Sequence, residues 1–248
     1  MENSSNNTVL LMLSGGRDSF LSACRLLDSS EKYYLKMVTF DNGCSYQSNN
    51  PKTVAERIIK KYGAERVEYL GVQNISATVR EFFFPYFNMK ACDISENYPG
   101  LTPSQFHCLI CRTSMYIHSI KTAVANDAKY IAEGGRKDQG FVIELPEMVE
   151  KLSSLVERAG LKLLLPVYDL NSDWERDNEL MARGFLSKTY EPKCIIGVPI
   201  QGSVDEQVIE SVTDYYTNII EPIIVDKKLL SDDRPITYND YEYNELYK

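Results

Sequence analysis

The chain contains a short run of residues whose types and spacing suit the binding of an anion. It follows the apolar stretch 9–13 and consists of Ser14, Gly15, Gly16, Arg17, Asp18 and Ser19. Glycines allow a backbone to approach a ligand closely. If a helix begins directly after them, its first N–H groups lack internal partners and its dipole adds partial positive charge. Hydroxyl groups and a guanidinium add further donors. The run therefore predicts a phosphate-binding loop.

Cysteines form a second group with chemical potential. Cys108 and Cys111 make a C-x2-C pair, and Cys194 lies far downstream. The pair falls at the start of an expected helix, whose dipole would lower the thiol pKa values. One such pair is consistent with zinc, a redox dithiol or part of an iron–sulfur cluster. A structural zinc site needs four ligands, which the three cysteines and either His107 or His118 could supply.

Alternating strands and helices must position these groups. The apolar patterns predict strands at 8–13, 34–40, 66–72, 129–132 and 161–167. They predict helices at 18–27, 52–62, 75–87, 106–126, around 143–152, 173–183 and 204–219. Strands that alternate with long helices form a parallel sheet covered on both faces. We therefore predict an α/β fold, with a doubly wound, mostly parallel five-stranded sheet and helices on both faces.

The first two strands end in polar turns that contain glycine. The first ends at the run 14–19, and the second ends at Phe40, Asp41, Asn42 and Gly43. In open parallel sheets the ligand crevice lies beyond the carboxyl ends of the strands. We therefore expect both turns to border one ligand site.

The run SGGRDS at 14–19 resembles the SGGxDS signature of the PP-loop ATP pyrophosphatase superfamily, and the GxxxxGK[ST] loop of other NTPases is absent. The resemblance implies a Rossmann-like, HUP-type fold and an enzyme that cleaves ATP between the α- and β-phosphates. Such enzymes adenylate a carbonyl or carboxylate oxygen, and a nucleophile then displaces AMP. The resemblance further implies that 14–19 hold the phosphates and that Phe40, Asp41 and Asn42 lie against the adenosine.

Within that superfamily, the cysteine pattern resembles the iron–sulfur branch of the tRNA thiolation enzymes. That branch carries a C-x2-C on the helix before the fourth strand and a third cysteine well downstream. The resemblance implies that Cys108, Cys111 and Cys194 hold a [4Fe-4S] cluster and leave one iron open for the incoming sulfur. A sulfur donor is then a required partner.

The turn after the fourth strand departs from that branch. The branch has a T-G-H-x-x-D-D type turn, whereas this chain reads EGGRKD at 133–138, which keeps a glycine and one acidic residue but no histidine. By the resemblance, Gly134 borders the nucleotide, Asp138 or Asp18 binds Mg²⁺, and Arg136 or Lys137 clamps phosphate. The departure leaves the subfamily and the substrate open.

Length and charge limit the remaining possibilities. The 248 residues fit a PP-loop domain over 1–200 and a C-terminal helix with an acidic, tyrosine-rich tail over 201–248 that packs on it. The tail could instead wrap a second copy, so a homodimer is possible. A net charge of −8 favours a small-molecule substrate, although a local basic stripe could hold tRNA. The sequence shows neither a bilayer-spanning apolar run nor a signal peptide, so we expect a cytoplasmic protein without membrane contacts.

Two other functions compete with thiolation. An amide- or nitrile-forming ligase of the deazaguanine synthase type shares the adenylation step, but that branch carries a four-cysteine zinc site, which this chain does not show. A non-catalytic nucleotide-binding module, like the universal-stress-type relatives of the fold, carries a different glycine pattern. Metal analysis separates the first alternative, and ATP binding without turnover would favour the second.

Overall fold

A computed structural model describes residues 7–88, 96–196, 204–231 and 236–238 of the chain. Its centre is a parallel sheet with the strand order β4-β2-β1-β5-β6, in which every pairing is parallel. The strands are β1 (Thr8–Met12), β2 (Tyr34–Asp41), β4 (Val67–Asn74), β5 (Tyr130–Ala132) and β6 (Lys162–Leu164). The predicted five-stranded parallel sheet is confirmed.

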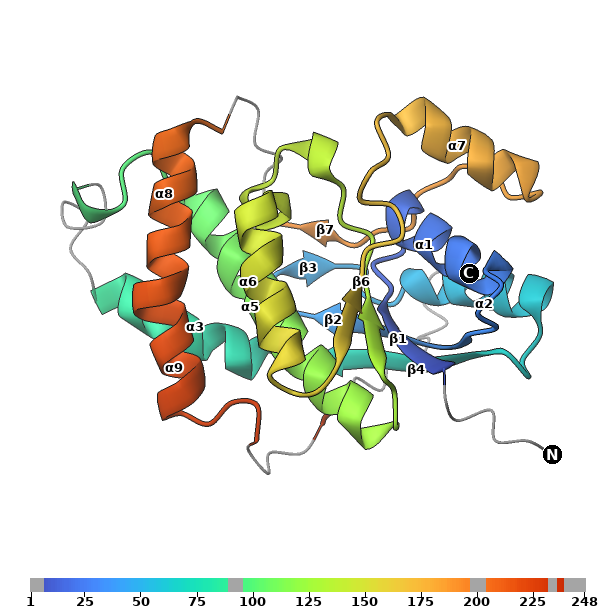
Figure 1. The fold of residues 1–248 in the computed structure, drawn as a ribbon, viewed down its shortest axis with the longest axis horizontal. Coiled ribbons are helices and arrows are strands. Elements are labelled where there is room, and N and C mark those ends of the chain that lie inside the picture. The colour runs from blue at the N-terminus through green and yellow to red at the C-terminus, as the bar shows by residue number, and fades with distance from the viewer. Residues whose placement is uncertain (1–6, 89–95, 197–203, 232–235, 239–248) are drawn as a thin grey trace, which may run out of the picture.

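Helices cover both faces of the sheet (Figure 1). One face carries α1 (Arg17–Asp28), α2 (Pro51–Tyr62) and α7 (Asp173–Ala182). The other carries α3 (Ser76–Asn88), α5 (Pro103–Ala125), α6 (Pro146–Glu157), α8 (Glu206–Tyr215) and α9 (Glu221–Asp226). Strand β1 supplies both cores because side chains alternate along a strand: Val9 and Leu11 pack with the α1 side, whereas Leu10 and Met12 pack with the α5 side.

Helix α5 begins earlier than the predicted residue 106. The Thr102 hydroxyl accepts a hydrogen bond from the Gln105 N–H, the Gln105 side chain accepts one from the Thr102 N–H, and Pro103 stands at the first helical position. This capping box moves Cys108 and Cys111 into the second and third turns of the helix. Their expected place at the helix start is therefore wrong.

Other boundaries differ for local reasons. Strand β6 is shorter than the predicted 161–167, and Pro166, which has no N–H to donate, lies beyond its end. The helix expected around 143–152 begins only at Pro146, after two 3₁₀ turns, η2 (Lys137–Gln139) and η3 (Val142–Glu144). The helix expected at 204–219 continues through a π-helical turn, η4 (Tyr216–Ile220), into α9.

A small antiparallel ribbon forms between the segment that follows β2 and a segment about 150 residues further along the chain. It consists of β3 (Ser45–Tyr46) and β7 (Lys193–Cys194), and Ser45 pairs with Cys194. The sequence pattern did not predict this ribbon, because two-residue strands have no periodicity. It places Cys194 beside the turn that follows β2.

The C-terminal helices share the core of the α5 side. Val208, Val212 and Ile224 belong to the same apolar cluster as α5 and α6. The domain boundary at residue 200 nevertheless stays a prediction. Most of the acidic, tyrosine-rich tail expected at the end of 201–248 lies outside the described residues. Among the helices that are described, none combines the length and the apolar character needed to cross a membrane.

Candidate active site

A cavity of about 890 Å³ lies at the carboxyl ends of β1 and β2, where the sequence predicted the ligand site. Most of the predicted site residues line it: Ser14, Gly16, Arg17, Asp18, Ser19, Phe40, Asn42, Cys108, Cys111, Gly134, Arg136 and Cys194. Within the described part of the chain, the lining does not include Gly15, Asp41, Lys137 or Asp138. The phosphate loop and the three cysteines thus share one cavity.

The loop after β1 has the geometry of an anion site. Gly15 has a φ of +78°, and a Cβ there would lie 2.8 Å from the carbonyl oxygen of Tyr190. The Gly16 N–H donates to the Ser14 hydroxyl over 3.1 Å, which tightens the turn. Gly16 is also the N-cap of α1 and has no side chain to cap the first helical N–H groups. These groups are therefore available to an anion.

Close packing against the start of α1 accounts for the glycine at position 134, in the turn after β5. A Cβ at this position would lie 2.5 Å from the backbone nitrogen of Ser19, in the first turn of α1. A larger residue would push the turn away from the phosphate loop. The structure brings Gly134 against the loop, and its contact with a nucleotide stays a prediction.

Glu191 lies on the phosphate loop, although the sequence gave no sign of this. A Cβ built on Gly16 would lie 3.0 Å from the Glu191 Oε2. Burial raises the pKa of the Glu191 carboxyl, and a hydrogen bond with Ser14 opposes that rise. The neighbouring Tyr190 N–H donates to the Gly15 carbonyl over 2.9 Å. A phosphate group bound against Gly16 would require the Glu191 side chain to move.

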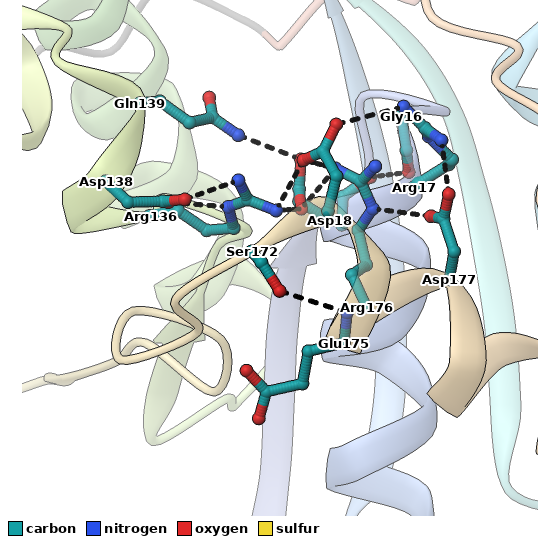
Figure 2. Close-up of polar contacts among 12 residues, drawn as sticks. Gly16, Arg17, Asp18, Arg136, Asp138, Gln139, Ser172, Glu175, Arg176 and Asp177 are labelled. Carbon is teal, nitrogen blue, oxygen red and sulfur yellow. Dashed lines mark hydrogen bonds and ion pairs between the residues drawn. The ribbon is translucent and has the colours of Figure 1, made fainter.

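Asp18 is the centre of a charged network beside the loop (Figure 2). Its carboxylate accepts hydrogen bonds from Arg136 Nη1 at 3.3 Å, Arg176 Nη1 at 3.1 Å and Gln139 Nε2 at 3.0 Å. The opposite edge of Arg136 makes two 2.9 Å bonds to Asp138. Asp138 therefore orients Arg136, and the roles predicted for Asp138 as a Mg²⁺ ligand and for exposed Lys137 as a clamp stay predictions.

Helix α7 supplies the other half of this network. Arg176 also contacts Asp177 through Nε at 2.9 Å and Asp173 through Nη1 at 3.0 Å. Arg17 reaches the same Asp177 at 2.7 Å. Asp173 is largely exposed; the small loss of hydration disfavours its charged form, but Arg176 and Arg136 outweigh this effect and lower its pKa. The sequence gave no sign that α7 would meet α1, because the contact joins residues far apart along the chain.

The turn after β2 lies between the 14–19 loop and the cysteines in the lining of the cavity. Phe40 and Asn42 line the cavity. Asn42 donates from Nδ2 to the Cys111 sulfur over 3.1 Å, and its Oδ1 accepts from the Cys44 N–H over 2.8 Å. The Asp41 carboxylate caps its own turn by accepting from the Gly43 N–H over 2.9 Å. Contact of these residues with adenine or ribose stays a prediction.

The cysteine side of the cavity also contains a histidine. Cys108, Cys111, Cys194 and His107 all line it, and the Cys194 sulfur lies 3.4 Å from His107 Nε2. The other candidate, His118, instead lies 2.8 Å from the Thr78 hydroxyl. These side chains are the donor types of a cluster or a zinc site. In the described residues, however, no three His, Cys, Asp or Glu side chains are grouped closely enough to hold a metal ion.

Burial determines the state of the thiols. It raises the pKa of Cys111 to about 12, against the opposing effect of the Asn42 hydrogen bond, and it also raises the pKa of Cys108. The expectation that the helix dipole lowers both values is therefore wrong. The dipole acts within the first turn, and the capping box places both residues deeper in the helix. Cys44, which no sequence motif singles out, also lies close to Cys194: its carbonyl accepts a hydrogen bond from the N–H of the next residue, Ile195, over 2.9 Å.

Two buried carboxylates, Glu133 and Glu144, lie near Arg112, which lines the cavity. Glu133 pairs with Arg112 and accepts from the Tyr116 hydroxyl over 2.7 Å. Glu144 lines the cavity, and burial raises its pKa to about 8, although Arg112 opposes the rise. The Glu144 Oε2 is buried and has no hydrogen-bond partner among the described residues. Sequence reasoning assigned no role to these residues.

No protein-family model and no curated protein sequence matches the chain. Solved structures do match. A 4-thiouridine synthetase in complex with RNA and bound ATP has a TM-score of 0.60 and 14% identity, and the match covers 92% of this chain and 54% of that one. This chain therefore spans about half the length of the synthetase.

Two further matches have scores too low to support an argument. The U34-tRNA thiolase NcsA from Methanococcus maripaludis, solved with its [4Fe-4S] cluster, has a TM-score of 0.46 and 16% identity over 97% of this chain and 77% of that one. NMN synthetase from Francisella tularensis has a TM-score of 0.47 and 11% identity, and the match covers 95% of this chain and 90% of that one. At 14% identity the match with the 4-thiouridine synthetase shows the fold alone, which agrees with the α/β fold predicted from the sequence, and it leaves the branch unresolved.

Proposed function

We propose that the protein is an ATP-dependent adenylating enzyme, which converts ATP to AMP and pyrophosphate while it activates an oxygen atom of its substrate. The observation that supports this most strongly is the convergence of the SGGRDS loop, the uncapped N-terminus of α1 and Arg136 on one cavity. A helix N-terminus beside buried cations favours phosphate groups.

The first half of the proposed reaction takes place at the phosphate loop. The substrate oxygen attacks the α-phosphorus and forms a new O–P bond. The bond from the α-phosphorus to the bridging oxygen breaks, and its electron pair leaves with pyrophosphate. Residues 14–19 orient the phosphates, and Arg136 stabilises the charge that develops on the leaving group. Adenylation is needed because AMP is a far better leaving group than an amide or carboxylate oxygen.

Asp18 is the proposed Mg²⁺ ligand. It lines the cavity beside the phosphate loop, and Mg²⁺ commonly takes one or two carboxylates together with substrate phosphates and waters. The ion would offset charge on the phosphates. Asp138 is the alternative ligand; both carboxylates pair with Arg136, but only Asp18 lines the cavity within the described part of the chain.

We assign the second half to the cysteine side of the cavity. A sulfide from the sulfur donor attacks the activated carbon and forms a C–S bond, AMP leaves with the electron pair of the C–O bond, and the proton on the sulfur is released. Cys108, Cys111 and Cys194 would hold a [4Fe-4S] cluster, which when bound supplies an open iron for the incoming sulfur. The opening of these cysteines onto the same cavity as the phosphate loop supports the assignment. The substrate is a tRNA base or a small molecule, and the net charge of −8 favours the latter.

A substitution of Asp18 tests the first half. D18N removes the carboxylate charge beside the loop and should abolish pyrophosphate release while the protein stays folded. The matched control is Asp28→Asn at the other end of α1, where Asp28 pairs with Arg183. MgATP binding is measured by calorimetry, and pyrophosphate release is measured with unfractionated tRNA and with a small-molecule extract. A wild-type protein that does not bind ATP, or a fully active D18N variant, would contradict the proposal.

A zinc-dependent ligase is the second candidate. The contact of 3.4 Å between Cys194 and His107 adds a histidine to the three thiols, and a Cys₃His donor set is typical of structural zinc. In this case a nitrogen nucleophile displaces AMP and forms an amide or nitrile. Anaerobic purification distinguishes the two. Brown protein with iron and acid-labile sulfide supports the thiolation enzyme, whereas colourless protein with one zinc supports the ligase.

A further inference from the structure

We propose that Arg176, in the first turn of α7, is a second residue that binds the pyrophosphate portion of ATP. This inference rests on the proposed adenylation, because that reaction places pyrophosphate beside Asp18. Neither the SGGRDS loop nor the turn after β5 contains this residue, and it enters the site only through the packing of α7 against α1.

Two of the three nitrogens of the Arg176 guanidinium make hydrogen bonds or ion pairs with aspartates, and the third has no acceptor in the described residues. Its Nε donates to Asp177 at 2.9 Å, and its Nη1 contacts Asp18 at 3.1 Å and Asp173 at 3.0 Å. Its Nη2 is buried and finds no hydrogen-bond acceptor in the described residues. Buried donors of a charged group are normally satisfied. The three aspartates therefore hold the group in one orientation and leave a donor for a ligand.

The position of Arg176 identifies the ligand as a phosphate group. Arg176 lines the cavity together with Gly16 and Asp18, and its Nη1 shares the Asp18 carboxylate with Arg136. The side chains of Arg176 and Arg136 are only 3% and 4% exposed, whereas that of Arg17 is 29% exposed. Charges with so little water around them interact strongly with an anion. A guanidinium also matches the oxygens of phosphate geometrically.

The balance of charge favours pyrophosphate that carries a metal ion. The network contains the guanidinium groups of Arg17, Arg136 and Arg176. It also contains one more carboxylate than guanidinium, from Asp18, Asp138, Asp173 and Asp177. This net negative charge opposes the binding of free pyrophosphate, and a magnesium ion bound to pyrophosphate reduces the repulsion because it offsets part of the ligand's own negative charge. Arg176 would stabilise the oxygens of the leaving group as they gain the electron pair of the broken P–O bond.

Calorimetry with magnesium pyrophosphate, and separately with AMP, tests the assignment without a known substrate. Arg176→Gln should weaken pyrophosphate binding by at least about tenfold, since it removes a charge-assisted hydrogen bond, and should leave AMP binding unchanged. The matched control is Arg183→Gln at the other end of α7. Arg183 pairs with Asp28 and Glu179, away from the cavity, and R183Q should bind pyrophosphate as the wild type does. Equal affinities of R176Q and wild type would overturn the proposal.

A measurement on the wild-type protein covers the case in which R176Q does not fold. Magnesium pyrophosphate should slow amide hydrogen exchange in the first turn of α7, at 173–176, and leave its last turn unchanged. Unchanged exchange throughout α7 in the presence of saturating pyrophosphate would overturn the inference. If the wild type binds MgATP, and R176Q binds magnesium pyrophosphate as tightly as the wild type does, only this inference fails. If the wild type binds neither MgATP nor magnesium pyrophosphate, the proposed adenylation itself fails.

Discussion

The two sides of the cavity are organised in different ways. On the phosphate side, Asp18 and Arg136 are fixed by several short contacts, and the loop itself is formed by six consecutive residues. On the cysteine side, the thiols come from α5 and β7, and no three metal-binding side chains of the described residues are grouped as a site. The phosphate side is thus held in place by several contacts, whereas the side chains of the cysteine side are not gathered around one point in the described residues. Perturbations of each side should therefore have separable effects.

The largest effect is expected from Gly15→Ala. The φ of +78° costs about 1–2 kcal/mol for a residue with a Cβ, and the contact of 2.8 Å with Tyr190 adds about 1–3 kcal/mol of overpacking. Thermal unfolding should show this loss, and calorimetry should show loss of ATP binding. The control is Gly140→Ala, because Gly140 has a φ of +71° and no atom within 4 Å of the built Cβ. If G15A and G140A behave alike, the close approach at Gly15 is unimportant.

A substitution of Cys194 should separate the two sides. Cys194→Ser removes one of three thiol ligands, and we expect it to lose most of the bound iron or zinc while it binds MgATP as the wild type does. Cys24→Ala is the control, since Cys24 is buried in the core of the α1 side, away from the cavity, and this variant should retain its metal. Loss of ATP affinity in C194S would instead show that the two sides form one cooperative unit.

Glu144, which lines the cavity, predicts a dependence of stability on pH. Burial raises its pKa from an ordinary 4.5 to about 8, so the folded state binds a proton that the unfolded state releases. The free energy of unfolding should therefore fall as pH rises from about 4.5 to 8, by an amount on the order of a few kcal/mol. Glu144→Gln should flatten this slope in urea titrations. An unchanged slope would show that Glu144 ionises at an ordinary pH in the folded protein.

The smallest effect is expected from Glu191, which lies over the phosphate loop. Glu191→Gln removes a negative charge from the position where phosphate should bind, so the affinity for ATP should rise roughly three- to tenfold. Glu147→Gln on α6, an exposed acidic residue, is the control and should bind ATP as the wild type does. Weaker ATP binding by E191Q would indicate that Glu191 contacts the nucleotide instead of competing with it.

The sequence predicted those features that depend on neighbouring residues. The five strands, their parallel arrangement and the glycine loop follow from apolar runs and from SGGRDS at 14–19. Features that depend on distant residues were missed. Arg176 reaches Asp18 across 158 positions, and Cys194 reaches the turn after β2 through a ribbon of two-residue strands. The thiol pKa values were misjudged because Thr102 starts α5 earlier than the apolar pattern suggested.

The segment from Tyr190 to Ile195 is fastened at both ends. The Tyr190 N–H is bonded to the Gly15 carbonyl, and the Ile195 N–H is bonded to the Cys44 carbonyl. Only four residues separate these two hydrogen bonds. So short a segment has little freedom to absorb a shift at one end without moving at the other. A ligand that moves the backbone at Glu191 would therefore also move the backbone at Cys194. The position of the phosphate loop and that of the Cys194 thiol would then be coupled through one short stretch of backbone.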